Sequence, residues 1–242
     1  MALAMYFLKK KPNSLVQKKI KIENMIKFFL IRHAQSEGNM RSEYISGQSV
    51  HHNLSEKGIT QAKLLGKRFK KRGLGEHYEI CVSPAVRTMQ TATYFCNEIG
   101  LDTKILQATP EVLELSQGDW TGQLRTAVYT QEVLDLIKFD AWHFAAPNGE
   151  SQSDVGHRFY KFLHSKIQKY QHVQETIHVY VFTHAVAIKC IIKELFGIDA
   201  QHTFRIGVEN TSITILEYTP QKFFSLNKVN DVAHLEMADL LD

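Results

Sequence analysis

Runs of apolar residues, separated by polar and turn residues, predict a series of strands along the chain. Residues 28–31 are all apolar, as expected for a strand buried on both faces of a sheet. Residues 79–82 and 178–182 predict a second and a third buried strand. Two later strands are predicted at residues 212–218 and 223–226.

Helical periodicity with recognisable end signals lies between these strands. Apolar residues recur at helical spacing, for example at Ile59, Ala62 and Leu65. Serine supplies an N-cap oxygen, proline suits the first helical position, and glycine suits the C-terminal end. On these signals four helices are predicted: from Ser55 to Gly73, from Ser83-Pro84 to Gly100, following Ser151, and from the third strand to Gly197.

The alternation of strands and helices predicts the fold class. Consecutive buried strands joined by helices favour a parallel sheet with helices on both faces. We therefore expect an α/β three-layer sandwich with a mostly parallel central sheet, formed as a single domain by residues 26–242. Residues 124–147 have weaker periodicity, and residues 1–25 are predicted to be a basic extension, frayed or weakly docked, with attachment to a surface as the alternative.

Composition narrows the class of protein without changing this picture. The net charge is +4, and several lysines fall in the first 27 residues, so no strongly basic face or reading motif indicates nucleic-acid binding. The apolar run at residues 1–8 is too short to span a bilayer and lacks signal-peptide flanks. Three cysteines without CxxC spacing indicate no disulfide framework. We expect no stable membrane insertion and a cytoplasmic location.

Candidate chemistry lies directly after the three buried strands. Arg32-His33 follows the first strand, Ser83 with Arg87 one helical turn later follows the second, and Thr183-His184 follows the third. Ligands of open α/β sheets bind beyond the carboxyl ends of the strands. Arginines bind phosphate oxygens bidentately, and an unprotonated histidine is a nucleophile. If the strands are neighbours, these side chains converge on one phosphate-binding site.

The same residues carry a family resemblance. Residues 32–39, Arg-His-Ala-Gln-Ser-Glu-Gly-Asn, resemble the RHGxSxxN motif of the histidine phosphatase superfamily, also called phosphoglycerate mutase-like. Ala34 stands where the family usually has glycine, and Ala185 also follows a histidine where glycine is common. Further matches follow in the family's order at residues 54–62, 83–92, 114–122, 148–151, 183–184, 210–212 and 230–235.

The resemblance implies a role for each matching residue. His33 would be the nucleophile, Arg32, Arg87 and His184 would form the phosphate pocket, and Glu114 would protonate the leaving oxygen. Glu111 lies one helical turn away as an alternative acid, and Glu150 is expected to be structural, with a contact to the pocket left open. No metal or cofactor is implied. Further candidates for substrate contact are Asn39, Ser46 and Gly47, with rim candidates at His51, His52, Tyr129, Phe139, Trp142, His143 and Phe144. Of the last five, at least half are expected to pack in the core instead.

The predicted function is a histidine acid phosphatase-type phosphomonoesterase that acts on a small phosphorylated metabolite. The segment at residues 122–148 is short and lacks the Arg-Arg cluster with which mutases of the superfamily retain a bisphosphate, so water is the expected acceptor. A phosphoglycerate mutase-type phosphotransferase and a non-catalytic phospho-ligand binding module remain alternatives. The sequence has no clustered Asp/His spacing that would indicate a metallophosphatase. The oligomeric state, monomer or dimer, is left open.

Overall fold

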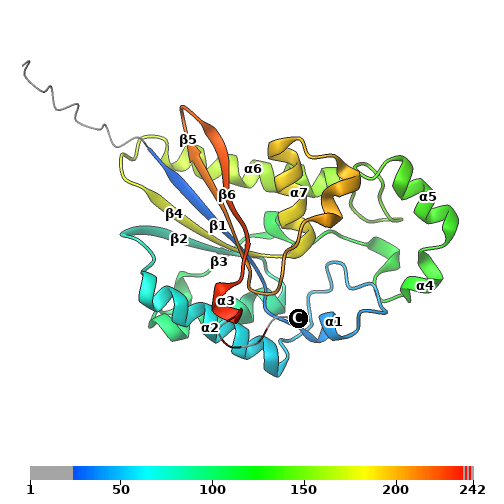
Figure 1. Ribbon diagram of the computed structural model, residues 1–242, viewed down its shortest axis with the longest axis horizontal. Coiled ribbons are helices and arrows are strands. Elements are labelled where there is room, and N and C mark those ends of the chain that lie inside the picture. The colour runs from blue at the N-terminus through cyan, green and yellow to red at the C-terminus, as the bar shows by residue number, and fades with distance from the viewer. Residues whose placement is uncertain (1–23, 237, 239, 241–242) are drawn as a thin grey trace, which may run out of the picture.

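The computed structural model describes residues 24–236, 238 and 240. It contains a six-stranded mixed sheet with the strand order β3-β2-β4-β1-β5-β6 and helices on both faces (Figure 1). The fold is an α/β sandwich. The strands are β1 (Ile26–Arg32), β2 (His77–Val82), β3 (Gln107–Ala108), β4 (Ile177–Thr183), β5 (Ile213–Thr219) and β6 (Phe223–Asp231).

Three of the five strand pairings are parallel and two are antiparallel. β1 pairs with β4 in parallel, and β4 pairs with β2 in parallel, so the three predicted buried strands are neighbours. β5 runs antiparallel to β1, and β6 runs antiparallel to β5. The sheet is therefore mostly parallel, as predicted, with an antiparallel edge formed by the two late strands.

The two faces of the sheet pack against different helices. Phe28 and Leu30 of β1 belong to a core formed with α6 and α7, whereas Phe29 and Ile31 belong to a core formed with α2 and α3. The two pairs of helices cover opposite faces of the sheet (Figure 1). This alternation explains why the strand is apolar throughout. The helices are α1 (Glu37–Met40), α2 (Glu56–Arg72), α3 (Val86–Ile99), α4 (Arg125–Val128), α5 (Gln131–Phe139), α6 (Gln152–Tyr170), α7 (Ala185–Phe196) and α8 (Ala233–Glu236).

Most of the predicted helix ends are confirmed, and one is wrong. Ser55 and Ser151 are N-caps whose side chains accept backbone N–H groups, and Gly73 and Gly197 are C-caps. The prediction that Ser83-Pro84 starts a helix is incorrect, because α3 begins at Val86 with Ala85 as its N-cap. The hydroxyl of Ser83 bonds a histidine ring instead of a helix terminus.

Other predictions have mixed outcomes. Cys81, Cys96 and Cys190 are buried and free, in agreement with their apolar surroundings. Residues 124–147 contain two short helices, α4 and α5, and β6 extends beyond its predicted end at residue 226. The basic extension at residues 1–25 falls almost entirely outside the described residues. Within the described part of the chain, no helix is long and apolar enough to cross a bilayer.

Candidate active site

His33 lies directly beyond the carboxyl end of β1, in contact with the neighbouring strand β4. Its backbone N–H donates to Thr183 O at 2.9 Å. Its ring Nδ1 lies 2.7 Å from Ala34 O, and a carbonyl accepts only, so Nδ1 carries the hydrogen. Nε2 is therefore the unprotonated nitrogen, and its lone pair can accept a hydrogen bond or attack an electrophile.

Arg87 in the first turn of α3 faces this lone pair. Its Nε donates to His33 Nε2 at 3.2 Å. Its terminal nitrogens donate to Ser49 O and, more weakly, to Gly47 O at 3.4 Å. Arg87 is 4% exposed, so its guanidinium is held by carbonyls rather than by water. A cation fixed in this way can stabilise negative charge on a bound group without reorganising.

His184 completes the group from the end of β4. Its Nδ1 lies 3.1 Å from Arg87 Nη2, and since arginine only donates, Nδ1 accepts. Nε2 then carries the hydrogen and donates to Ser83 Oγ at 2.7 Å. The rings of His33 and His184 are 5.2 Å apart between centroids. Residues from three neighbouring strand ends are thus brought together, as the sequence predicted.

Both histidines are neutral in this setting. Burial lowers the pKa of His33 well below its ordinary value, and the charges of Arg87 and Arg32 lower it further, against a smaller opposing effect of the bond to Ala34. Burial and the charge of Arg87 likewise hold the pKa of His184 well below the ordinary value. A buried imidazole beside arginines keeps an unprotonated nitrogen at neutral pH.

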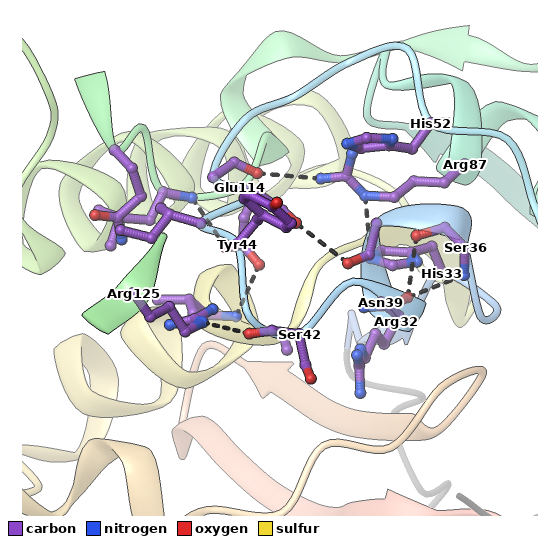
Figure 2. A pocket seen from close by; sticks show the side chains of 18 of the residues that line it. Arg32, His33, Ser36, Asn39, Ser42, Tyr44, His52, Arg87, Glu114 and Arg125 are labelled. Atoms are coloured by element: carbon purple, nitrogen blue, oxygen red, sulfur yellow. Dashed lines mark hydrogen bonds between the residues drawn. The ribbon is translucent and has the colours of Figure 1, made fainter. Parts of the chain in front are cut away.

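A cavity of about 230 Å³ opens over these groups. Figure 2 shows Arg32, His33 and Arg87 grouped on one side of it and Arg125 on the other, next to Ser42. His184 is fully buried behind Arg87 and does not line it. The predicted substrate-contact residues Asn39, Ser46 and Gly47 do line it, together with Tyr44, His52, Glu114, Gln117 and Tyr129.

Glu114 lies at the cavity and next to a helix N-terminus. Its carboxylate accepts N–H groups of Val186 at 3.2 Å and of Ala187 at 3.1 Å, both in the first turn of α7. A third N–H comes from Leu115 at 2.9 Å. Glu111, the alternative acid, is exposed and absent from the cavity lining. Position therefore favours Glu114 over Glu111 as the group that meets a bound substrate.

The sequence as a whole decides which family these residues come from. The model of the histidine phosphatase superfamily (branch 1) matches residues 28–232. The chain belongs to this superfamily. The match spans all six strands and every residue of the site described above.

The proteins that are similar in sequence to this chain include both phosphatases and mutases. The chain is 30% identical over 215 residues to phosphoserine phosphatase 1 of Hydrogenobacter thermophilus, covering 87% of this chain and 95% of that one. It is 29% identical over 175 residues to a 2,3-bisphosphoglycerate-dependent phosphoglycerate mutase of Bartonella henselae, covering 71% and 82%. The solved structure of Bacillus stearothermophilus YhfR has the same fold, with a TM-score of 0.72, 23% identity, and coverage of 87% and 99%.

A network behind the superfamily site holds the segment that carries Glu114. Arg158 on α6 donates to the carbonyls of Glu111 at 2.8 Å and Glu114 at 2.9 Å, and its Nε donates to Glu150 Oε1 at 2.9 Å. Glu150 also accepts from Gln48 at 3.1 Å. Glu150 is therefore a structural residue, as expected, and Arg158 is a supporting residue that sequence reasoning missed.

Of the rim candidates, only some reach the cavity. His52 and Tyr129 line it, and His51 lies against His52 with 4.5 Å between ring centroids. Phe139 is 90% exposed on α5 and is absent from the cavity lining. The other candidates are absent from the cavity lining: Trp142 packs on the α6 side of the core, His143 bonds Asp140, and Phe144 packs on Trp120.

Metal-ligating clusters are a separate question. Among residues 24–236, 238 and 240, no group of three or more His, Cys, Asp or Glu side chains is placed to hold a metal ion. The positive charge of the cavity comes from arginines, which cannot act as metal ligands.

Proposed function

We propose that this member of the superfamily is a metal-independent phosphatase that hydrolyses small phosphomonoesters through a phosphohistidine on His33. The observation that carries the proposal is the pairing of an unprotonated His33 Nε2 with Arg87 at 3.2 Å, inside a cavity that Arg32 also lines. The superfamily membership and the 30% identical phosphoserine phosphatase relative support it.

In the first step His33 Nε2 attacks the phosphorus atom. An N–P bond forms, and the bond between phosphorus and the ester oxygen breaks. Arg32 and Arg87 hold the equatorial oxygens as charge develops on them. The departing alkoxide takes a proton from Glu114.

In the second step a water molecule replaces the departed alcohol. The Glu114 carboxylate accepts a proton from this water, and the resulting hydroxide oxygen bonds to phosphorus. The N–P bond breaks, inorganic phosphate leaves, and His33 returns to its neutral form with Nδ1 still bonded to Ala34 O. No metal takes part in either step, because the arginines supply the positive charge.

The few residues of the α4–α5 segment that line the cavity favour water as the acceptor of the phosphoryl group. A mutase must retain a bisphosphate between transfers, which requires several cations above the nucleophile. From α4, α5 and the loop between them, the residues that line the cavity are Arg125 and Tyr129. One arginine at the rim provides a contact for a substrate group but little to retain a second phosphate.

Arg125 indicates which small phosphomonoester is preferred. Its Nε donates to Ser42 O at 2.8 Å, which holds the guanidinium at the rim. The described cavity lining contains three arginines and one carboxylate, Glu114. We propose that Arg125, which lies across the cavity from His33 and Arg87, binds a further anionic group such as a carboxylate.

The direct test is hydrolysis of p-nitrophenyl phosphate in excess EDTA. We expect turnover to survive the chelator and inorganic phosphate to appear in equal amount to p-nitrophenol. Loss of activity with EDTA would contradict the metal-independent mechanism. Phosphate transfer to an added phosphoglycerate without release of inorganic phosphate would favour the mutase, and binding without any turnover would favour a non-catalytic module.

A further inference from the structure

Two sequence motifs matched the superfamily but have no place in the chemistry above. Residues 210–212 and 230–235 do not line the cavity. In the structure they meet directly behind the nucleophile. Asn210 Nδ2 donates to His33 O at 2.8 Å, and the Thr211 N–H donates to Arg32 O at 3.1 Å. The Arg32 N–H in turn donates to Ser212 O at 3.2 Å.

Thr211 holds this position in an unusual backbone conformation. Its φ angle is +55°, in the left-handed region that β-branched residues rarely adopt. Such a conformation persists only where the surroundings fix it. Thr211 is completely buried, and its hydroxyl lies 2.9 Å from Nε2 of His234 on α8. The side-chain contact to His234 is therefore part of what fixes the backbone at Thr211.

His234 is itself oriented by a chain of charged groups. Arg68 on α2 lies 3.5 Å from His234 Nδ1, and because arginine only donates, the His234 hydrogen is on Nε2, facing Thr211. Arg68 is held by a bidentate pair with Asp231 at 2.8 and 2.7 Å. Burial and the charge of Arg68 lower the pKa of His234 to about 4, so the ring is neutral at neutral pH.

A second contact fixes the other end of the same loop. The N–H of Glu209 donates to Asn230 Oδ1 at 2.6 Å, and Asn230 also has a left-handed φ of +54°. Asn230 at the start of the 230–235 motif and His234 near its end thus both contact the loop that carries Asn210 and Thr211. Its rigid contact with Arg32 and His33 sets where the nucleophile lies relative to the cavity.

We propose that Asn210, Thr211 and His234 form a nucleophile clamp, in which His234 is a positioning residue for phosphoryl transfer although it lies outside the cavity. The inference rests on the proposed function of His33. In-line attack needs the reacting nitrogen within a fraction of an ångström of its productive place, so a small shift of this backbone lowers the rate. The substrate contacts of Arg125 and Tyr129 are on other elements and stay unchanged.

The clamp is tested with a double-mutant cycle on p-nitrophenyl phosphate. His234→Phe keeps a ring but removes the hydrogen bond, and Thr211→Val keeps the β-branched shape but removes the hydroxyl. We expect each to lower kcat about 10-fold while KM changes less than about 3-fold. The double variant should be no slower than either single variant, because both remove the same contact.

Rescue and spectroscopy separate positioning from simple loss of structure. His234→Gln places an amide nitrogen near the former Nε2 and should recover kcat to within about 3-fold of wild type. The NMR resonance of the His33 Nδ1 proton should shift in His234→Phe and return in His234→Gln. His178→Phe is the matched control: His178 of β4 bonds Leu74 O and does not line the cavity, so the change should lower stability without changing kcat.

Other outcomes would overturn the inference. Unchanged kcat in both His234→Phe and Thr211→Val would show that the contact does not position the nucleophile. Additive losses of kcat in the double variant, or an equal loss of kcat in His178→Phe, would show that general destabilisation lowers the rate. Failure of the proposed function itself is distinguishable, because the wild-type protein would then neither hydrolyse p-nitrophenyl phosphate nor phosphorylate His33.

Discussion

Strand β2 carries buried polar residues at both ends, and the two ends differ in how their charges are balanced. Near its start, Glu79 is 5% exposed and forms ion pairs with Lys166 and with Lys169 at 2.8 Å. The hydroxyl of Tyr170 donates to the same carboxylate at 2.5 Å. We call these four residues the Glu79 cluster. Beyond the other end of the strand, Ser83 contacts His184 in the candidate active site.

The Glu79 cluster is complete without a ligand. Burial alone would raise the pKa of Glu79, but hydrogen bonds from Lys166, Lys169 and Tyr170 outweigh it and lower the pKa to about 2. The carboxylate therefore stays ionised and joins β2 to α6. In the active site, by contrast, Arg87 donates to two neutral histidine rings and to two backbone carbonyls, none of which carries a charge that could balance it. A surplus of one sign of charge distinguishes a ligand site from a structural ion cluster.

The largest contrast between the two regions is expected from one substitution in each. His33→Ala should lower kcat for p-nitrophenyl phosphate by at least about 10⁴-fold with little change in stability, because the nucleophile is lost. Glu79→Gln should leave kcat within about 2-fold and lower the free energy of unfolding by about 2 kcal/mol, discounted because Lys169 is half exposed. Steady-state kinetics and urea unfolding measure both. Comparable kinetic losses in the two variants would contradict the division of roles.

Glu114→Gln should slow the enzyme by about 10²–10⁴-fold on alkyl phosphates, because an alkoxide needs a proton to leave. The loss should be much smaller for p-nitrophenyl phosphate, whose phenolate leaves without help. Glu111→Gln is the matched control, since that carboxylate is exposed and away from the cavity. A silent Glu114→Gln with a slow Glu111→Gln would transfer the role of the acid to Glu111.

Acid should weaken the two regions in different pH windows. His33, His184 and His234 have lowered pKa values in the folded protein, so below their ordinary pKa of 6.5 the unfolded chain binds more protons. This contribution to stability is therefore full above 6.5 and falls as the pH drops; for His234, whose pKa is lowered to about 4, the loss at about pH 5 is about 2 kcal/mol. Glu79, with its lowered pKa, contributes only above its ordinary 4.5 and is lost as the pH falls toward 2.

Urea unfolding across this range can separate the windows. We expect His234→Gln to flatten the fall between about pH 6.5 and 5, and Glu79→Gln to change only the fall below about pH 4.5. A fall of the same steepness in the upper window for His234→Gln and the wild type would show that the buried ring is not held neutral.

The smallest expected effect concerns Arg125 at the rim. Arg125→Met keeps the length of the side chain and removes its charge. We expect kcat/KM for phosphoserine to fall about 10-fold, and that for phosphoethanolamine, which lacks the carboxylate, to change less than about 2-fold. Equal effects on the two compounds would show that Arg125 does not bind an anionic group of the substrate.

Sequence patterns predicted the parts of the molecule that depend on local structure. Residues 28–31 are apolar because both faces of β1 are covered, and the register that pairs Arg32 with Thr183 brings the two histidines together. Ser55 and Gly73 bound α2 through contacts within one helical turn. Such signals involve neighbouring residues, so they are visible in a single sequence.

Contacts between distant segments could not be predicted in this way. Ser83 has the residue type and the following proline of a helix start, but its hydroxyl is used by His184, 101 residues away. Arg125 approaches the cavity because Tyr44 and Leu124 form an antiparallel bridge, which no periodicity in the exposed 124–147 segment indicates. In the sequence Arg158 looks like an ordinary surface residue of a helix. Only the folded structure shows that it donates to the backbone carbonyls of Glu111 and Glu114.

The central claim is that His33 Nε2 becomes covalently bonded to phosphorus. The most direct measurement is to quench the wild-type protein during turnover of p-nitrophenyl phosphate in EDTA and to locate any phosphoryl group by peptide mass spectrometry. The account predicts an acid-labile phosphoryl group on the peptide that contains His33, formed and discharged as fast as the enzyme turns over. Turnover at full rate without any such species, or with the phosphoryl group on another residue, would contradict it.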